Sequence, residues 1–299
     1  MQVFDKVVYT FDKDQAPLGR AGDGEVLLFK TQDCFGCQVT SEDQVLSDVD
    51  LTQVNPATGP VYIEGAQPGD VLVVDILDIQ VEDHGYAMSM GGVGPLADSI
   101  QARTRRIDIK DGFASFNDVS FPIDPMIGVI GTAPAGDPMA SGLSFDHGGN
   151  MDSKKIKKGS RVYLPVWVEG GLLQMGDLHA HMGDGELSGT GIEISGQVLV
   201  QVHLLKDFDL RLPLTETQDF WYVNATEKDY LASLDKGVRE MARLAQDALG
   251  WDISDVNIFL SIQGSVEINQ ATPGMVPMIN LRIGLPKLAG KKPLVPFNK

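Results

Sequence analysis

The alternating segment GIEISGQVLVQVHLLK, which covers residues 191–206, decides the fold class of this chain. Apolar side chains recur at alternate positions between Ile192 and Leu204, and polar side chains such as Glu193 and Gln201 lie between them. Successive side chains of a strand point to opposite faces, so this period of two predicts a long, half-exposed β-strand. Glu193 should lie near the start of that strand and point away from the apolar layer.

Apolar runs on both sides of this segment predict further strands. A Pro-Gly-Asp turn at residues 68–70 precedes the run VLVVDILDIQV, which is long enough for a largely buried strand. Pro165 lies inside another run, and a proline there is typical of an edge strand or a bulge. The predicted strands cover residues 24–33, 71–81, 162–168, 191–206 and 278–285.

Only one long segment has the apolar spacing of a helix. Residues 227–249 (EKDYLASLDKGVREMARLAQDAL) carry an apolar stripe at helical intervals, with Thr226 as the expected N-cap and Gly250 just beyond the end. No repeat, low-complexity tract or linker divides the chain. The sequence therefore predicts one mostly-β unit over residues 1–299, with one long helix near the C-terminus.

Composition excludes several classes of partner. The chain carries 24 Lys and Arg against 41 Asp and Glu, a formal charge of −17, which repels phosphate backbones and anionic lipids. We therefore expect neither nucleic acid nor a membrane as a partner. The first residues lack a basic segment followed by an apolar one, and no apolar run approaches the roughly 18 residues that span a bilayer. A soluble cytoplasmic protein is expected.

Most of the chemically active side chains fall in the middle of the chain. Three glycine-flanked motifs, HGGNMD (147–152), GDLH (176–179) and GDGE (183–186), are followed by Glu193. Imidazole and carboxylate are ligands that hold zinc and similar divalent ions. Glycines let the backbone turn sharply and bring such groups together. The clustering predicts a functional site here.

Each motif also has a plainer interpretation. Asp177 and His179 are two residues apart, so in an extended strand they project to one side and could share an ion. A histidine beside an aspartate is equally the pattern of a hydrogen-bonded structural pair, and Gly-Asp-Gly-Glu alone is an acidic turn.

Cys34 and Cys37 form a single C-x-x-C. A second pair, which a structural zinc site would need, is missing, and the context is a strand end rather than a redox turn. We interpret the spacing as incidental. Cys34, directly after Asp33, is kept as an alternative nucleophile.

The chain resembles the acetamidase/formamidase family of amide hydrolases. The resemblance is carried by residues 147–152, 176–179, 183–186 and 191–193, together with Leu-Pro-Val at 164–166. Further support comes from NPATGPVYIEGA (55–66), Pro-Gly-Asp (68–70) and IGVIGTAP (127–134), so the match runs through most of the chain in order. The large insertion that longer members carry after Ala133-Pro134 is missing, which places the chain nearer the short, acetamidase-like branch.

The resemblance implies a fold and an activity. The fold would be a jelly-roll-like β-sandwich with additional α+β elements. The activity would be hydrolysis of short aliphatic amides of the acetamide and formamide class, at linear carbon–nitrogen bonds, to the carboxylic acid and ammonia. It also implies a divalent metal, with zinc expected and calcium considered as a second ion. We further expect a homo-oligomer, either a dimer or a tetramer.

The motifs and the resemblance together suggest metal-assisted amide hydrolysis. A zinc-type ion polarises a carbonyl and acidifies water, and a nearby carboxylate moves the proton to the departing nitrogen. Glu186 is the expected general base, with Asp184 and Glu193 as further catalytic candidates, Glu193 in a supporting position. Asn150 would bind the substrate or stabilise the oxyanion. The expected metal ligands are His147, Asp152, Asp177 and His179.

Two other functions remain open at this stage. The first is a metal-free amidase in which a carboxylate activates Cys34 as the nucleophile. The second is a jelly-roll protein that binds a cation or a small amide-like solute without turnover. Chelation would inhibit the metal enzyme, and loss of the thiol would inhibit the cysteine enzyme.

Overall fold

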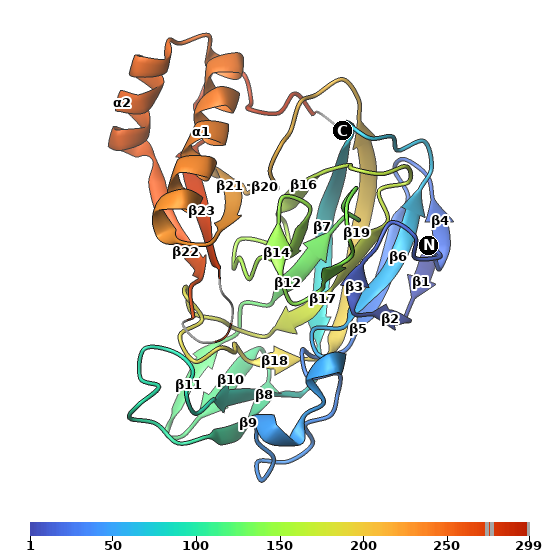
Figure 1. Cartoon of the computed structure of the whole chain (residues 1–299), viewed down its shortest axis with the longest axis vertical. Helices are drawn as coiled ribbons and strands as arrows, with labels where there is room; N and C mark the ends of the chain where they lie inside the picture. Colours follow the sequence, from blue (N-terminus) through green and yellow to red (C-terminus); the bar gives the residue numbers. More distant parts are fainter. Residues whose placement is uncertain (273–274, 276–277, 298–299) are drawn as a thin grey trace.

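The computed structural model describes residues 1–272, 275 and 278–297. Strands dominate the structure, which confirms the mostly-β prediction, and two large sheets pack face to face (Figure 1). The strands of the first sheet are, in spatial order, β1 (Gln2–Phe4), β5 (Val26–Thr31), β19 (Gly196–Leu205), β7 (Val71–Val81), β16 (Arg161–Pro165), β20 (Leu214–Glu216), β21 (Phe220–Glu227), β23 (Ile279–Pro286) and β22 (Ser265–Gln270).

The second sheet carries the motifs from the middle of the chain. Its main path is β11 (Val119–Pro122), β10 (Phe113–Phe116), β9 (Arg103–Lys110), β8 (His84–Ser89), β18 (Glu193–Ile194), β17 (Leu173–His179), β12 (Met126–Gly131), β15 (Gly148–Asn150) and β14 (Ser144–Phe145). Strand β6 (Ala57–Ile63) joins it beside β17 and pairs in turn with β2 (Val7–Val8) and β4 (Gly19–Ala21). A separate short pair consists of β3 (Thr10–Phe11) and β13 (Met139–Ala140).

The space between the sheets is filled by one apolar core. Val74 and Val200 reach it from the first sheet, and Ile127, Met175 and Leu178 from the second, all completely buried. A fully buried side chain of this kind contributes about 1.5–3 kcal/mol relative to an exposed one. Strand β17 is buried along its whole length by this packing, so side chains at its end have fixed positions.

The segment predicted as one strand over residues 191–206 is two strands in different sheets. β18 pairs with β17 in the second sheet, and β19 begins at Gly196 in the first. A side chain at position 196 would lie 2.3 Å from the carbonyl oxygen of Gln80, so this close crossing needs glycine. The alternation survives the break because Ile194 and Val198 both face the same core.

The helical prediction needs a correction at its start. Helix α1 (Tyr230–Leu249) begins after Asp229, whose side chain accepts a hydrogen bond from the Ala232 amide. Thr226 is not the cap, because strand β21 continues through it and pairs with β23. The end is confirmed: Gly250 is left-handed, at φ 69°. α1 lies on β21 and β23, where Met241 and Leu244 enter a second apolar core (Figure 1).

A second helix, α2 (Ile253–Gln263), follows α1 and was not predicted. Its apolar residues do not form a single stripe: Val256 is buried, whereas Ile253, Ile258 and Ile262 are exposed. The pattern therefore lacks the one-sided spacing that identifies a helix. Neither described helix is long and apolar enough to cross a membrane.

Candidate active site

Four of the predicted carboxylates converge around one imidazole, that of His179, at the end of β17. His179 Nε2 lies 3.1 Å from Glu193 Oε1, 3.5 Å from Asp177 Oδ1 and 3.8 Å from Glu186 Oε1. Asp152 lies beside them, and its carboxylate forms a compact group with His179 and Glu186. All five residues are between 1 and 5% exposed. We call Asp152, Asp177, His179, Glu186 and Glu193 the central cluster.

The pairing of the strands explains the convergence. His179 on β17 is directly opposite Glu193 on β18, which brings their side chains together. On the other side of β17, strand β12 contributes Gly128, where an added Cβ would lie 2.6 Å from both Asp152 Oδ1 and Asp177 Oδ2. The missing side chain at Gly128 therefore provides the space in which the two carboxylates meet.

Three members of the central cluster have an unusual backbone. Asp152, Asp177 and Glu186 adopt positive φ angles of 47°, 55° and 47°. Such conformations are uncommon for residues other than glycine, cost of order 1–3 kcal/mol each, and concentrate at functional sites. The fold thus directs three carboxylates to one place at a cost in backbone energy.

Neutral donors hold one oxygen of each carboxylate. Gln270 Nε2 donates to Asp152 Oδ2 at 2.8 Å and to Glu186 Oε2 at 2.5 Å. Asn55 Nδ2 donates to Asp177 Oδ2 at 3.0 Å. The other oxygen of Asp152 and of Asp177 is buried with no hydrogen-bond partner among the described residues. These oxygens are therefore available to a ligand.

Glu193 has the same arrangement. Its Oε1 accepts a hydrogen bond of 2.7 Å from the Gly191 amide, and its Oε2 is buried without a partner in the described structure. An unpaired buried acceptor is costly, and a buried charge more so, unless a proton or a cation compensates it.

Electrostatics at the cluster favour binding of positive charge. Burial raises the pKa of Glu193 to about 8 and also raises those of Asp152 and Glu186. Burial alone would lower the pKa of His179, but the neighbouring Glu193 and Asp177 carboxylates outweigh it and raise that pKa well above its usual value. Four acids surround one base, so a bound cation would relieve their mutual repulsion.

Two sets of three residues have ligand atoms within 4.8 Å of one another. The first is Asp152, His179 and Glu186, and the second is Cys34, Asp177 and Glu193. Carboxylate and imidazole in the first set fit a zinc-type ion. The second set includes sulfur, which does not suit calcium, an ion that prefers oxygen ligands.

His147 lies outside both sets, contrary to its predicted place among the ligands. Its ring packs edge-on against Phe11, with centroids 4.8 Å apart, and stacks near Phe145. Neither ring nitrogen has a hydrogen-bond partner in the described structure, and burial lowers the pKa of His147 to about 4. Residues Gly148–Asn150, which follow His147, form strand β15.

Asn150 borders the site rather than joining the cluster. Its side-chain oxygen is buried and unpaired within the described structure. Together with Gln270 it lines a small cavity of about 10 Å³, whose other walls include Ser144, Thr226 and Asn280. A cavity of that size has room for about one water molecule.

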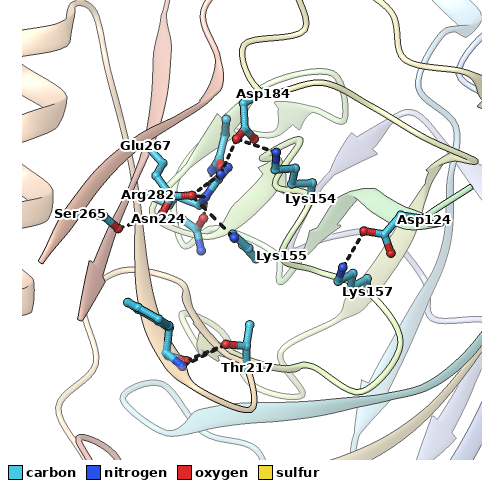
Figure 2. A network of polar contacts seen from close by, with 12 residues as sticks. Asp124, Lys154, Lys155, Lys157, Asp184, Thr217, Asn224, Ser265, Glu267 and Arg282 are labelled. Atoms are coloured by element: carbon cyan, nitrogen blue, oxygen red, sulfur yellow. Dashed lines mark hydrogen bonds and ion pairs between the residues drawn. The ribbon is translucent and has the colours of Figure 1, made fainter. Parts of the chain in front are cut away.

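Asp184 is separated from the cluster although it precedes Glu186 by only two residues. Its carboxylate lies 2.8 Å from both Arg282 and Lys154 and is 34% exposed (Figure 2). Burial would raise the pKa of Asp184, but the two cations lower it, so the group stays ionised. The structure thus places the catalytic candidate Asp184 in an ion pair with buried Arg282, which also binds Glu267.

Cys34 lies beside the central cluster, but its surroundings favour the protonated thiol, which is a poor nucleophile. Its sulfur is within reach of Asp177 and Glu193. Burial raises the pKa of the Cys34 thiol well above its usual value, and the neighbouring carboxylates add to the effect. Since the thiolate is the reactive form, this surrounding disfavours it. Cys37 is exposed and lies 3.5 Å from Ser195 Oγ.

Sequence reasoning missed three residues that shape the cluster: Gln270, Asn55 and Gly128. Gln270 ends β22, 84 residues after Glu186, and nothing in the local pattern SVEINQ marks its amide as functional. Asn55 and Gly128 belong to motifs that carried the family resemblance, but neither had an assigned role. Long-range pairing of strands brings all three to the site.

Comparison with known proteins gives one consistent family. The model described as the Acetamidase/Formamidase family matches residues 6–142 and 140–231. A formamidase of Methylophilus methylotrophus is 31% identical over 273 residues, which cover 70% of this chain and 66% of that protein, slightly less than two thirds of its length.

Two solved structures have nearly the same fold. An acetamidase from Bacillus halodurans superposes with a TM-score of 0.92 at 36% identity, covering 95% of this chain and 97% of the other. A predicted acetamidase/formamidase from the thermophile Thermoanaerobacter tengcongensis gives the same TM-score and identity, with 95% of each chain covered.

Proposed function

The chain belongs to the acetamidase/formamidase family, and from this premise we propose that it hydrolyses short aliphatic amides to the carboxylic acid and ammonia. The central cluster is the observation that carries the proposal. Four buried carboxylates surround one imidazole. Asp152, Asp177 and Glu193 each keep an oxygen that no described residue satisfies, and one oxygen of Glu186 faces His179. A purely structural cluster would pair these oxygens internally.

We propose that a divalent ion, zinc in the first instance, binds where these oxygens meet. Asp152, Asp177 and His179 would hold it, with His147 removed from the ligand set because of its position. Such an ion supplies Lewis-acid polarisation of the amide carbonyl and a source of hydroxide at neutral pH. Carboxylate and imidazole donors fit a zinc-type ion. The absence of a side chain at Gly128 leaves room for the carboxylates of Asp152 and Asp177 to converge on such an ion.

Glu186 is the side chain best placed to move protons. Its Oε2 is held by Gln270, and its Oε1 faces His179 Nε2. Burial raises the pKa of Glu186, so the group is a stronger base than an exposed glutamate. It would accept a proton from the attacking water and return it to the departing nitrogen, with Glu193, 3.1 Å from His179 Nε2, as the supporting acid.

Asn150 would orient the substrate. Its unpaired oxygen borders the small cavity and could accept a hydrogen bond from the amide nitrogen of the substrate.

Ammonia release tests the proposal. We expect the purified protein to release ammonia from formamide or acetamide, to lose this activity with a strong chelator, and to recover it with added zinc. Cys34→Ser should keep activity within a few-fold of the parent, because the raised pKa of the thiol disfavours the reactive thiolate.

For each part of the proposal, one result of this assay would contradict it. Turnover that survives complete removal of divalent ions contradicts the metal role. Collapse of turnover in Cys34→Ser with zinc still bound would transfer the reaction to the thiol. Zinc binding with no ammonia from any short amide would support the non-catalytic binding protein instead.

Thermal stability offers a test that does not depend on turnover. Folding raises the pKa values of Asp152, Glu186, Glu193 and His179, so the folded chelated protein holds protons that the unfolded chain releases. These bound protons stabilise the folded state. Their contribution is complete in mild acid and is lost as pH rises toward about 8, the pKa of Glu193. The Tm of chelated protein should therefore fall between about pH 5 and about pH 8.

Zinc provides the control for this experiment. It replaces the protons as counter-charge, so the decline should be smaller with zinc present. In a domain of this size, 1 kcal/mol corresponds to about 2–4 °C in Tm. A Tm of chelated protein that rises over the same pH interval would contradict the assigned protonation of the cluster.

Three further expectations are kept as proposals. Residues 1–299 would act as one unit, the protein would assemble as a dimer or tetramer, and it would work in the cytoplasm. Calcium as a second ion is less well supported, because the second set of ligand atoms contains the Cys34 sulfur.

A further inference from the structure

We propose that Gln270, which the C-terminal part of the chain contributes to the amidase site, is a positioning residue that sets both metal affinity and the orientation of the general base. The inference rests on the proposed function and deepens it. Gln270 lies outside the residues 6–142 and 140–231 that match the family model, so the model assigns it no role.

The Gln270 amide connects two carboxylates of the cluster. Its nitrogen donates to Asp152 Oδ2 at 2.8 Å and to Glu186 Oε2 at 2.5 Å, which uses both N–H bonds. The second oxygen of each acid is not held by Gln270: Asp152 Oδ1 has no hydrogen-bond partner in the described structure, and Glu186 Oε1 faces His179. Gln270 thereby selects which oxygen of each acid is available for metal binding or proton transfer.

A neutral double donor is well suited to this position. Two carboxylates close together repel each other in a buried site, and hydrogen bonds to their charged forms offset this. A lysine here would add a positive charge that competes with a cation for the cluster. A glutamate would add a further negative charge. Glutamine holds both acids without changing the net charge of the site.

The backbone around Gln270 is fixed to the turn that carries Glu186. Gly185 and Gln270 form an isolated parallel bridge, in which the Gly185 amide donates to the Asn269 carbonyl at 2.9 Å. Thr272 Oγ1 donates to the carbonyl oxygens of Gly185 and Glu186. Because the two segments are clamped together, the amide of Gln270 keeps its position relative to Glu186.

Arg282 also connects the turn that carries Glu186 to the end of β22. It is fully buried in β23 and contacts Asp184 of the turn (Figure 2). It also donates to the side-chain oxygen of Asn269, the neighbour of Gln270. The turn and the end of β22 therefore share one polar network. This network links the layer of β21, β22 and β23 to the site.

Replacement of Gln270 by methionine tests the role, because methionine keeps the length and loses both donors. We expect Gln270→Met to raise the Kd for zinc by about 10- to 100-fold, measured by competition with a chromophoric chelator. At saturating zinc, kcat should fall while KM changes little, because Glu186 loses its orientation.

Gln201→Met is the matched control. Gln201 also donates through its side-chain amide, to the Gly24 carbonyl, but it lies in β19 and, among the described residues, makes no hydrogen bond to the cluster. This variant should keep the zinc Kd and kcat of the parent. A change of similar size in both variants would mean that the loss of any such hydrogen bond has this effect, and would overturn the positioning role.

The outcomes separate this inference from the proposed function. Parent protein that binds no zinc and releases no ammonia contradicts the function. Parent activity together with an unchanged zinc Kd and kcat in Gln270→Met overturns the role of Gln270 alone. If Gln270→Met does not fold, Gln270→Leu serves instead, because it removes both donors without adding a charge. Parent-like zinc affinity and kcat in that variant would equally overturn the proposal.

Discussion

Glu186→Gln is expected to reduce kcat by on the order of 10²-fold or more while the protein keeps its fold and its zinc. The amide has the shape of the carboxylate but cannot accept and return a proton. KM should change little, because the lost interaction belongs to the transition state. Steady-state kinetics at saturating zinc, together with metal analysis of the same preparation, provide the measurement.

Asp184→Asn is the comparison on the same turn. Asp184 pairs with Arg282 and Lys154 rather than with the cluster, so its replacement should reduce kcat far less than Glu186→Gln. The acidic limb of the kcat/KM profile should change only in Glu186→Gln, since that limb reports the base. If Glu186→Gln instead loses its zinc, Glu186 is a ligand, and Glu193 becomes the better candidate for the base.

His179→Ala is expected to lose both zinc and activity. The imidazole is the proposed nitrogen ligand, and the carboxylates of Asp177 and Glu193 converge on it at 3.5 and 3.1 Å. Zinc per chain should fall from roughly one to near zero, because a site of carboxylates alone holds zinc poorly. Elemental analysis and ammonia release from the same sample give the result.

The fold of His179→Ala is expected to survive at lower stability. The ring is only 1% exposed, and its removal leaves a small cavity and two buried carboxylates without their partner. A buried acceptor that loses its partner costs about 1–3 kcal/mol. His203→Ala is the control, since His203 is also buried beside an acid, Asp23, but lies in β19. Retained zinc and turnover in folded His179→Ala would exclude His179 as a ligand.

Local pattern was sufficient for the kind of fold and for the region of the site. Alternating apolar residues predicted strands, because side-chain period follows from backbone geometry alone. The left-handed glycine after Leu249 marked the end of α1 for the same local reason. The motifs with His179, Glu186 and Glu193 contain residues that the structure brings together in the central cluster, and glycine-flanked acids and imidazoles are recognisable from residue type and spacing.

Several local features misled the same reasoning. The alternation over residues 191–206 continues through a crossing between sheets, because both strands face one core, so the pattern contains no sign of the break at Gly196. Asp184 and Glu186 share a turn but point to different partners. His147 belongs to a convincing motif, yet the pairing of β15 places its ring between aromatic side chains instead of in the cluster.

The sequence by itself determined the mostly-β class, the helix stop at Gly250 and the acids and imidazole that form the central cluster, because these depend on the chemistry and spacing of neighbouring residues. Only the tertiary structure decided which oxygen atoms face His179, which donors hold the others, and that Gln270 bridges Asp152 and Glu186. Those contacts join residues as far as 122 positions apart. Strand order and register bring them together, and neither can be deduced from the side chains at one end of the contact.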